Sequence, residues 1–280
     1  MINYLNTLRL FSRDVRLYLI TATLIGLTVF GGIYPALLNL YLHRLGYDLT
    51  FIGQVNGVSF LPIALFALPV GMLGGRWGPR RTMLIGLGLA ITGYGSMALA
   101  ELVPPVWQRG WLLLMSGVAG LGIACYIVNS NPFLMGMTGP AERQHAFSMQ
   151  GALWPLAGFG GSLLGGWLPG LFGRWLGLSL DQPAPYRYPL LLAALLLIPA
   201  VLALRAAAEV NLSPPARPAE AGSAQKQPSR AGIALFGLAG LMALIGFLRL
   251  SGEGSMRTFL NIYLDAELGT STALIGSLLP

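Results

Sequence analysis

Long apolar segments separated by short polar ones are the feature that most limits what this chain can form. A helix needs about 20 residues to cross the roughly 30 Å apolar core of a bilayer. By that measure we predict membrane spans at residues 17–42, 52–73, 82–100, 111–135, 147–172, 188–204 and 232–264, and an eighth that begins near Thr272. The sequence therefore predicts an all-α membrane protein, because helices satisfy their own backbone hydrogen bonds in lipid.

The composition agrees with a membrane protein and excludes other classes. The 280 residues are 55% hydrophobic and only 10% charged, whereas soluble domains carry about 25% charged residues. The net charge of +7 would in another chain suggest a nucleic-acid partner. Here the charges are few and lie between the apolar segments, so we expect the lipid bilayer as the partner and no nucleic acid.

The positive charges fall unevenly on the two sides that these spans define. If the N-terminus is cytoplasmic, four arginines lie on the far side: Arg44, Arg109, Arg174 and Arg187. Eleven positive residues lie on the near side: Arg9, Arg13, Arg16, Arg76, Arg80, Arg81, Arg143, Arg205, Arg217, Lys226 and Arg230. Because Lys and Arg accumulate in cytoplasmic loops, we predict a cytoplasmic N-terminus in the cell (inner or plasma) membrane.

A segment near the end of the chain repeats one near its start. Residues 32–42 read GIYPALLNLYL, and residues 254–264, which lie 222 positions later (254 − 32), read GSMRTFLNIYL. Asn39 and Asn261 are therefore equivalent. After one inserted residue the match continues, with Leu45-Gly46 against Leu268-Gly269 and Ile52-Gly53 against Ile275-Gly276. A repeat over this distance indicates two copies of a whole helical unit, as in many transporters.

The repeat divides the chain into three predicted regions. Residues 1–205 are predicted to form an N-terminal six-helix transmembrane bundle. Residues 206–231 are polar and rich in Pro, Ala, Glu and Gln, which is typical of a flexible linker, here cytoplasmic. Residues 232–280 are predicted to form an incomplete C-terminal bundle, with the seventh helix and the start of the eighth. Twelve spans need a longer chain, so we interpret this one as a fragment.

The loop after the second span carries a family motif. Residues 71–81 read GMLGGRWGPRR and are similar to the signature G-x-L-a-D-R-x-G-R-[RK] of the major facilitator superfamily. The matching positions are Gly71, Leu73, Arg76, Gly78 and Arg80. The resemblance implies a bundle of six plus six helices, in which this loop is a cytoplasmic gate whose charges pair across the halves. Gly75 replaces the signature's aspartate, which weakens that gate.

Small residues recur every four positions in the fifth predicted span. They are Gly158, Ser162, Gly166 and Gly170. At this spacing the four residues share one helix face. Small residues on one face let the backbones of membrane helices approach closely. We therefore predict that this face packs tightly against other helices.

Three charged residues mark the predicted seventh span. Arg249, Glu253 and Arg257 are spaced by four and share one helix face. A charge at the bilayer centre costs roughly 2.5–3.5 kcal/mol, so this face should point to protein or water. The first and seventh helices line the central cavity in the family that the chain resembles, which implies contact with solute or proton exchange at Glu253. Alternatively, residues 231–250 already span the bilayer and the charges lie at its rim.

Three asparagines are further candidates for the cavity. Asn39 and Asn261 are predicted near the outer ends of equivalent helices, either in the outer vestibule or in a helix–helix hydrogen bond. Asn129 precedes Pro132 and either opens the fourth helix towards the cavity or marks a structural kink. The chain carries no zinc-protease, nucleotide-binding or hydrolase motif. We therefore expect no metal, no cofactor and no catalysis.

Together these features predict a secondary active transporter that moves a small solute by alternating access, coupled to a proton or counter-solute gradient. The arginines favour an anionic solute, and we expect a monomer. One alternative is a permease subunit of an ATP-driven transporter, which would not explain the repeat or the loop at residues 71–81. Another is a membrane-embedded lipid-modifying enzyme, for which the acidic residues are too scattered.

Overall fold

The computed structural model describes residues 11–209, 252, 256 and 259–278, and in these ranges the regular structure is helical. The helices are α2 (Arg13–Thr28), α3 (Ile33–Arg44), α4 (Leu49–Trp77), α5 (Pro79–Ala98), the short η1 (Ala100–Leu102), α6 (Pro105–Met137), α7 (Pro140–Leu176), α8 (Ala184–Ala206) and α10 (Thr272–Leu278). Residues 259–266 are also helical. The all-α bundle is confirmed, whereas most of the predicted linker and most of the predicted seventh span lie outside the described residues.

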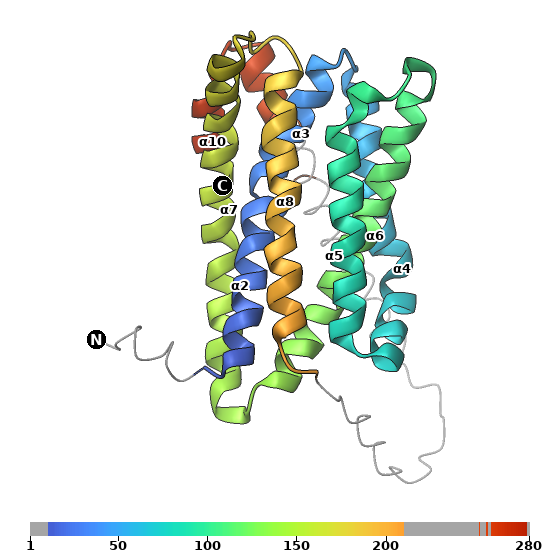
Figure 1. The fold of residues 1–280 in the computed structure, drawn as a ribbon, viewed down its shortest axis with the longest axis vertical. Coiled ribbons are helices and arrows are strands. Elements are labelled where there is room, and N and C mark those ends of the chain that lie inside the picture. Colours follow the sequence, from blue (N-terminus) through green and yellow to red (C-terminus); the bar gives the residue numbers. More distant parts are fainter. Residues whose placement is uncertain (1–10, 210–251, 253–255, 257–258, 279–280) are drawn as a thin grey trace, which may run out of the picture.

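The long helices run side by side in two groups (Figure 1). Helices α4, α5 and α6 pack together, α2 packs on α7, and α8 joins the groups by contacting both α2 and α5. Chain direction puts the start of α2 and the end of α8 at one end of the bundle, here called the α2 end. The opposite end, where α3 stops and α4 begins, is called the α3 end.

The first predicted span is broken into α2 and α3. Gly31 has φ +77°, a left-handed conformation that glycine adopts without a steric penalty. Pro35 was predicted inside a continuous helix, but it lies in the first turn of α3. Backbone N–H groups in a first turn have no partner within the helix, so proline loses nothing there. The break therefore explains how this span tolerates its proline.

The small-residue face of α7 packs tightly, as predicted. A Cβ on Gly158 would collide with the carbonyl oxygen of Phe30. Ser162 Oγ donates to the carbonyl oxygen of Gly276 at 2.7 Å, and a Cβ on Gly166 would lie 2.5 Å from the carbonyl oxygen of Thr272. Gly170 has open space beside it. The first residue of this face contacts the α2–α3 break, and the next two contact α10.

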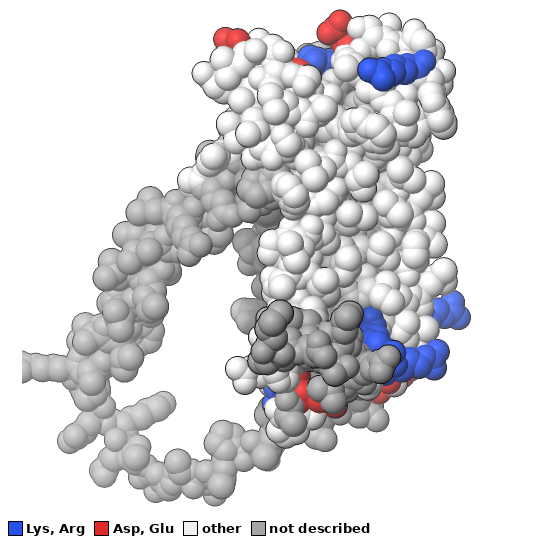
Figure 2. Space-filling model, turned by 90° about the vertical axis from the view of Figure 1, so that its left-hand side faces the viewer, with Lys and Arg blue, Asp and Glu red and all other residues white. Residues whose placement is uncertain are grey.

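Charged side chains gather at the two ends of the bundle. Figure 2 shows basic and acidic side chains at both ends of one face and a broad uncharged band between them. Large apolar side chains of α4 are exposed as well: Phe60, Leu61, Leu65 and Leu68. Within the described part of the chain, four segments are long and apolar enough to cross a membrane: Arg13–Arg44, Leu49–Trp77, Pro105–Met137 and Ala184–Ala206. The protein is a multi-pass membrane protein.

The repeat is visible in the local geometry. Tyr47 N–H donates to the Leu42 carbonyl at 3.2 Å, and the equivalent Thr270 N–H donates to the Leu264 carbonyl at 2.9 Å. The glycine of each copy, Gly46 or Gly269, has positive φ. The first bond spans six residues and, with its left-handed glycine, is a common way to end a helix. The second bond spans seven residues because of the inserted residue. Helices α4 and α10 then begin at equivalent residues, and the predicted start at Thr272 is confirmed.

Candidate functional site

The predicted cavity charges are not part of the described structure. Arg249, Glu253 and Arg257 all lie outside the described residues. Their contact with solute, and the alternative that they lie at the membrane rim, stay predictions. The candidates that the structure does describe are the three asparagines and the loop at residues 71–81.

Asn261 connects the second copy of the repeat to the first. Its side chain is fully buried. The Nδ2 group donates to the α3 carbonyl oxygens of Pro35 at 3.3 Å and Ala36 at 3.2 Å. Its Oδ1 accepts from the N–H of Ile262 at 2.9 Å. Asn261 therefore makes a helix–helix hydrogen bond, and its place in the outer vestibule stays a prediction.

Asn39 and Asn129 are also buried, and each takes part in a hydrogen bond with a residue of α4 or α6. Asn39 Oδ1 accepts from Asn56 Nδ2 of α4 at 2.8 Å. Asn129 Nδ2 donates to the Cys125 carbonyl at 3.0 Å. A Cβ on Gly74 would collide with Asn129 Oδ1, so the amide fills the space that this glycine leaves between α4 and α6. The equivalent residues Asn39 and Asn261 therefore bind different partners.

The motif loop turns sharply at the α2 end. Gly71, Leu73 and Arg76 lie in the last turns of α4, and the Arg76 side chain is exposed. Gly78 has φ +89°, which favours glycine, and α5 starts at the next residue with Pro79. Gly78 is therefore explained by the turn, and Gly71 by its closeness to α6.

The arginines of this loop bind the chain just after α8. Arg80 donates to the carbonyl oxygen of Arg205 at 3.5 Å and to that of Ala207. Glu209 lies 3.7 Å from Arg80 Nη2 and 2.9 Å from Arg81 Nε. All these groups belong to the first half and its immediate continuation. In this conformation the loop charges do not pair with the described residues of the second half.

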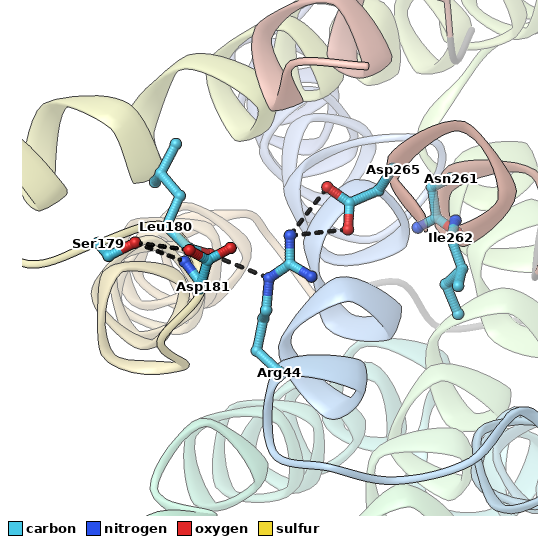
Figure 3. A network of polar contacts seen from close by, with 7 residues as sticks. All are labelled: Arg44, Ser179, Leu180, Asp181, Asn261, Ile262 and Asp265. Carbon is cyan, nitrogen blue, oxygen red and sulfur yellow. Dashed lines mark hydrogen bonds and ion pairs between the residues drawn. The ribbon is translucent and has the colours of Figure 1, made fainter. Parts of the chain in front are cut away.

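Arg44 is a functional candidate that the sequence reasoning missed. It ends α3, and its Nη2 lies 2.9 Å from Oδ1 and 2.8 Å from Oδ2 of Asp265 (Figure 3). Its Nε donates to the Leu180 carbonyl at 3.0 Å, and its guanidinium carbon lies 5.9 Å from the centre of the Tyr186 ring. Three segments of the chain therefore meet on this guanidinium.

The ion pair is largely shielded from solvent. The side chain of Arg44 is 18% exposed and that of Asp265 is 9% exposed. Salt screens such a pair less than a surface pair, and loss of one partner leaves the other without compensation. Among the described residues it is the ion pair that joins the two copies of the repeat. The repeat could have indicated this pair. Asp265 is the equivalent of His43, which is the neighbour of Arg44, so the two charges lie at the ends of equivalent helices.

The other polar contacts at the α3 end lie within the first half. Arg187 Nη1 lies 2.9 Å from Glu101 Oε2. The Tyr47 hydroxyl donates to Gln108 Oε1 at 2.7 Å. Burial raises the pKa of Tyr47 above its ordinary value, so the phenol keeps the proton that it donates. These contacts stabilise the frame against which Arg44 and Asp265 meet.

The comparisons with known proteins give the family. The family model described as Major Facilitator Superfamily matches residues 19–280. The chain belongs to the major facilitator superfamily. No curated protein and no solved structure matches it. Membership makes the protein a transporter of a small-molecule solute across the lipid bilayer, and it favours this class over the ATP-driven permease and the lipid-modifying enzyme.

Proposed function

We propose that this protein is a secondary active transporter in which two halves rock about a central site and expose it to each side in turn. The observation that carries the proposal is the contact between equivalent helix ends of the two copies, α3 and residues 259–266. Asn261 and the Arg44–Asp265 pair make this contact. When equivalent ends of two halves meet on one side, the space between the halves faces the other side.

The charge distribution supports an orientation for this closed end. Among the described residues, seven arginines lie at the α2 end: Arg13, Arg16, Arg76, Arg80, Arg81, Arg143 and Arg205. Four lie at the α3 end: Arg44, Arg109, Arg174 and Arg187. By the positive-inside rule, the α2 end and the N-terminus are cytoplasmic. The α3 end is then the outer end, and the conformation is closed to the outside.

The proposed central site uses the charged face of the seventh span. Arg249 and Arg257 would bind a carboxylate or phosphate of the solute, and Glu253 between them would take up and release a proton. The two positive charges favour the ionised form of Glu253, and an anion bound to them would favour the protonated form instead, so binding of the solute is coupled to uptake of a proton. Asn39 and Asn261 would line the outer vestibule after the outer end opens, and Asn129 the inner cavity. Because the repeat places parts of both halves in one chain, we propose a monomer.

Proteoliposomes loaded with the pH indicator pyranine test this function. External lactate, succinate or inorganic phosphate should change the internal pH of vesicles that contain the protein. Glu253→Gln should abolish the pH change because the amide cannot carry a proton, while solute–solute exchange of the accepted anion continues. Glu267→Gln is the matched control, because it makes the same charge change at an exposed position. Unaltered proton movement in Glu253→Gln would reject the role of Glu253.

A further inference from the structure

We propose that Arg44 is passed between two carboxylates, Asp265 when the outer end is closed and Asp181 when it is open. The proposal depends on the alternating access proposed above and assigns the group that controls the outer end. Its basis is the position of Arg44 between the second half and the α7–α8 loop, residues 177–183, in Figure 3.

The partners of Arg44 belong to different moving parts. Asp265 lies at the end of the helix that continues the second copy of the repeat, whereas Leu180 lies in the α7–α8 loop of the first half. Opening of the outer end would carry Asp265 away from α3. The bond from Arg44 Nε to the Leu180 carbonyl would remain, because both residues stay in the first half.

Arg44 needs a replacement charge when Asp265 leaves. A guanidinium that is only 18% exposed is poorly hydrated, and a shielded charge that loses its partner is costly. The Leu180 carbonyl and the nearby Tyr186 ring contribute partial charges only. Without a second anion, the lost ion pair would oppose every opening of the outer end and slow the transport cycle.

Asp181 is placed to supply that anion. It directly follows Leu180, so its backbone nitrogen is bonded to the carbonyl group that already holds Arg44. Ser179 fixes the turn, because its hydroxyl donates to Asp181 Oδ2 at 2.9 Å and accepts from the Asp181 N–H at 3.2 Å. The Asp181 side chain is exposed, and among the described residues it forms no ion pair. In the exchange, the Arg44 guanidinium would turn from Asp265 towards Asp181 while its Nε keeps the bond to the Leu180 carbonyl.

The two carboxylates therefore compete for one cation. Asp265 lowers the free energy of the closed outer end, and Asp181 lowers that of the open one. Neutralising each should shift the population in opposite directions. A role of Asp181 in loop structure alone would not give this result, since asparagine keeps the oxygen that accepts from Ser179.

A cysteine at Gly53 reports the state of the outer end. A Cβ there would lie 3.6 Å from Phe259 Cζ, which is an ordinary van der Waals contact, so a cysteine at this half-buried position would touch Phe259 of the second half without a collision. The background is Cys125→Ala, which removes the one native cysteine. A membrane-impermeant maleimide is added to intact cells and, separately, to inside-out vesicles. The labelling rate per amount of membrane-inserted protein measures how often the outer end opens.

The proposal expects labelling of intact cells to rise about tenfold in Asp265→Asn, a factor equal to about 1.4 kcal/mol. It expects labelling to fall about threefold in Asp181→Asn. Asp265→Glu and Glu267→Gln keep the charge pair and should label like the parent protein. Asp181 is exposed, so Asp181→Asn should fold normally. Its labelling rate therefore tests the exchange even where Asp265→Asn reduces the amount of protein.

Each other outcome overturns a defined part. A rise in Asp265→Asn with no fall in Asp181→Asn rejects the exchange of Arg44 and leaves alternating access intact. No change in either variant rejects both proposals. Opposite shifts seen only in inside-out vesicles support the exchange and reject the proposed orientation of the protein.

Discussion

Arginines at both ends of the bundle bind acidic residues, but the two ends differ in what they join. At the α3 end Arg44 pairs with Asp265 of the second copy of the repeat, with side-chain exposures of 18% and 9%. At the α2 end Arg81 pairs with Glu209, which follows α8, with exposures of 65% and 38%. The first pair is shielded and joins the halves, whereas the second is solvated and stays beside its own half.

The difference indicates how the family signature works in this chain. The signature has an aspartate where this chain has Gly75, so the loop lacks its own acidic partner. Arg80 and Arg81 instead bind Glu209 and the carbonyl groups around it. The loop arginines are occupied in the conformation in which Arg44 pairs with Asp265. Under the proposed alternating access, release from Glu209 would free them to pair with the second half when the α2 end closes.

The largest expected effect is a difference in stability between variants at the two ends. Arg44→Ala leaves Asp265 without its partner and should lower the free energy of unfolding by about 3 kcal/mol. Arg81→Ala removes an equal charge from an exposed pair and should cost less than about 1 kcal/mol. Thermal unfolding of the detergent-solubilised variants checks this. Equal losses in the two variants would show that shielding at the α3 end has no energetic consequence.

A second prediction concerns the other contact between the halves. Gly166→Val would press a side chain against the Thr272 carbonyl and Gly276 of α10. Overpacking of this kind costs about 2 kcal/mol, so the midpoint of thermal unfolding should fall. Gly170→Val is the matched control, because the same helix has open space one turn further on. A loss of stability as large in the control would mean that valine harms α7 itself and that the α10 contact is immaterial.

Local rules explain the parts of the fold that the sequence predicted. The start of α10 at Thr272 was predicted from the apolar segments, and the repeat accounts for it, because a glycine with positive φ follows the preceding helix in both copies. The contact face of α7 followed from the spacing of its small residues, since only small side chains let backbones touch. The break at Gly31 was missed, because the apolar run continues through it and glycine is common in membrane helices.

The ion pairs could not be predicted from the sequence, because they depend on how distant helices assemble. Arg44 and Asp265 are 221 positions apart, and Arg81 and Glu209 meet only because α8 ends beside the α4–α5 turn. Arg44 was counted solely as an outer positive charge. Sequence spacing places a residue at a depth in the membrane, but packing decides which residue faces it. The asparagines illustrate this, because Asn39 and Asn261 are equivalent in sequence and bind different partners.

The smallest predicted effect tests the solvated pair at the α2 end. Glu209→Gln weakens the attachment of the residues after α8 to the loop, at a cost below about 1 kcal/mol. Trypsin cleavage after Arg205, whose carbonyl accepts from Arg80, should therefore become a few-fold faster. Asp14→Asn is the control, because the amide keeps the oxygen that accepts from the Ala208 N–H.

Ionic strength should affect the ion pairs at the two ends differently. Raising the ionic strength from about 0.1 M to about 1 M shortens the Debye length from about 10 Å to about 3 Å. In the parent protein this should accelerate trypsin cleavage after Arg205 as Glu209→Gln does, since the Arg81–Glu209 pair is exposed. Maleimide labelling at Gly53→Cys should stay nearly constant, because the Arg44–Asp265 pair is shielded. If salt accelerated labelling as strongly as cleavage, both ends would be held by solvated charges, and the contrast between them would be wrong.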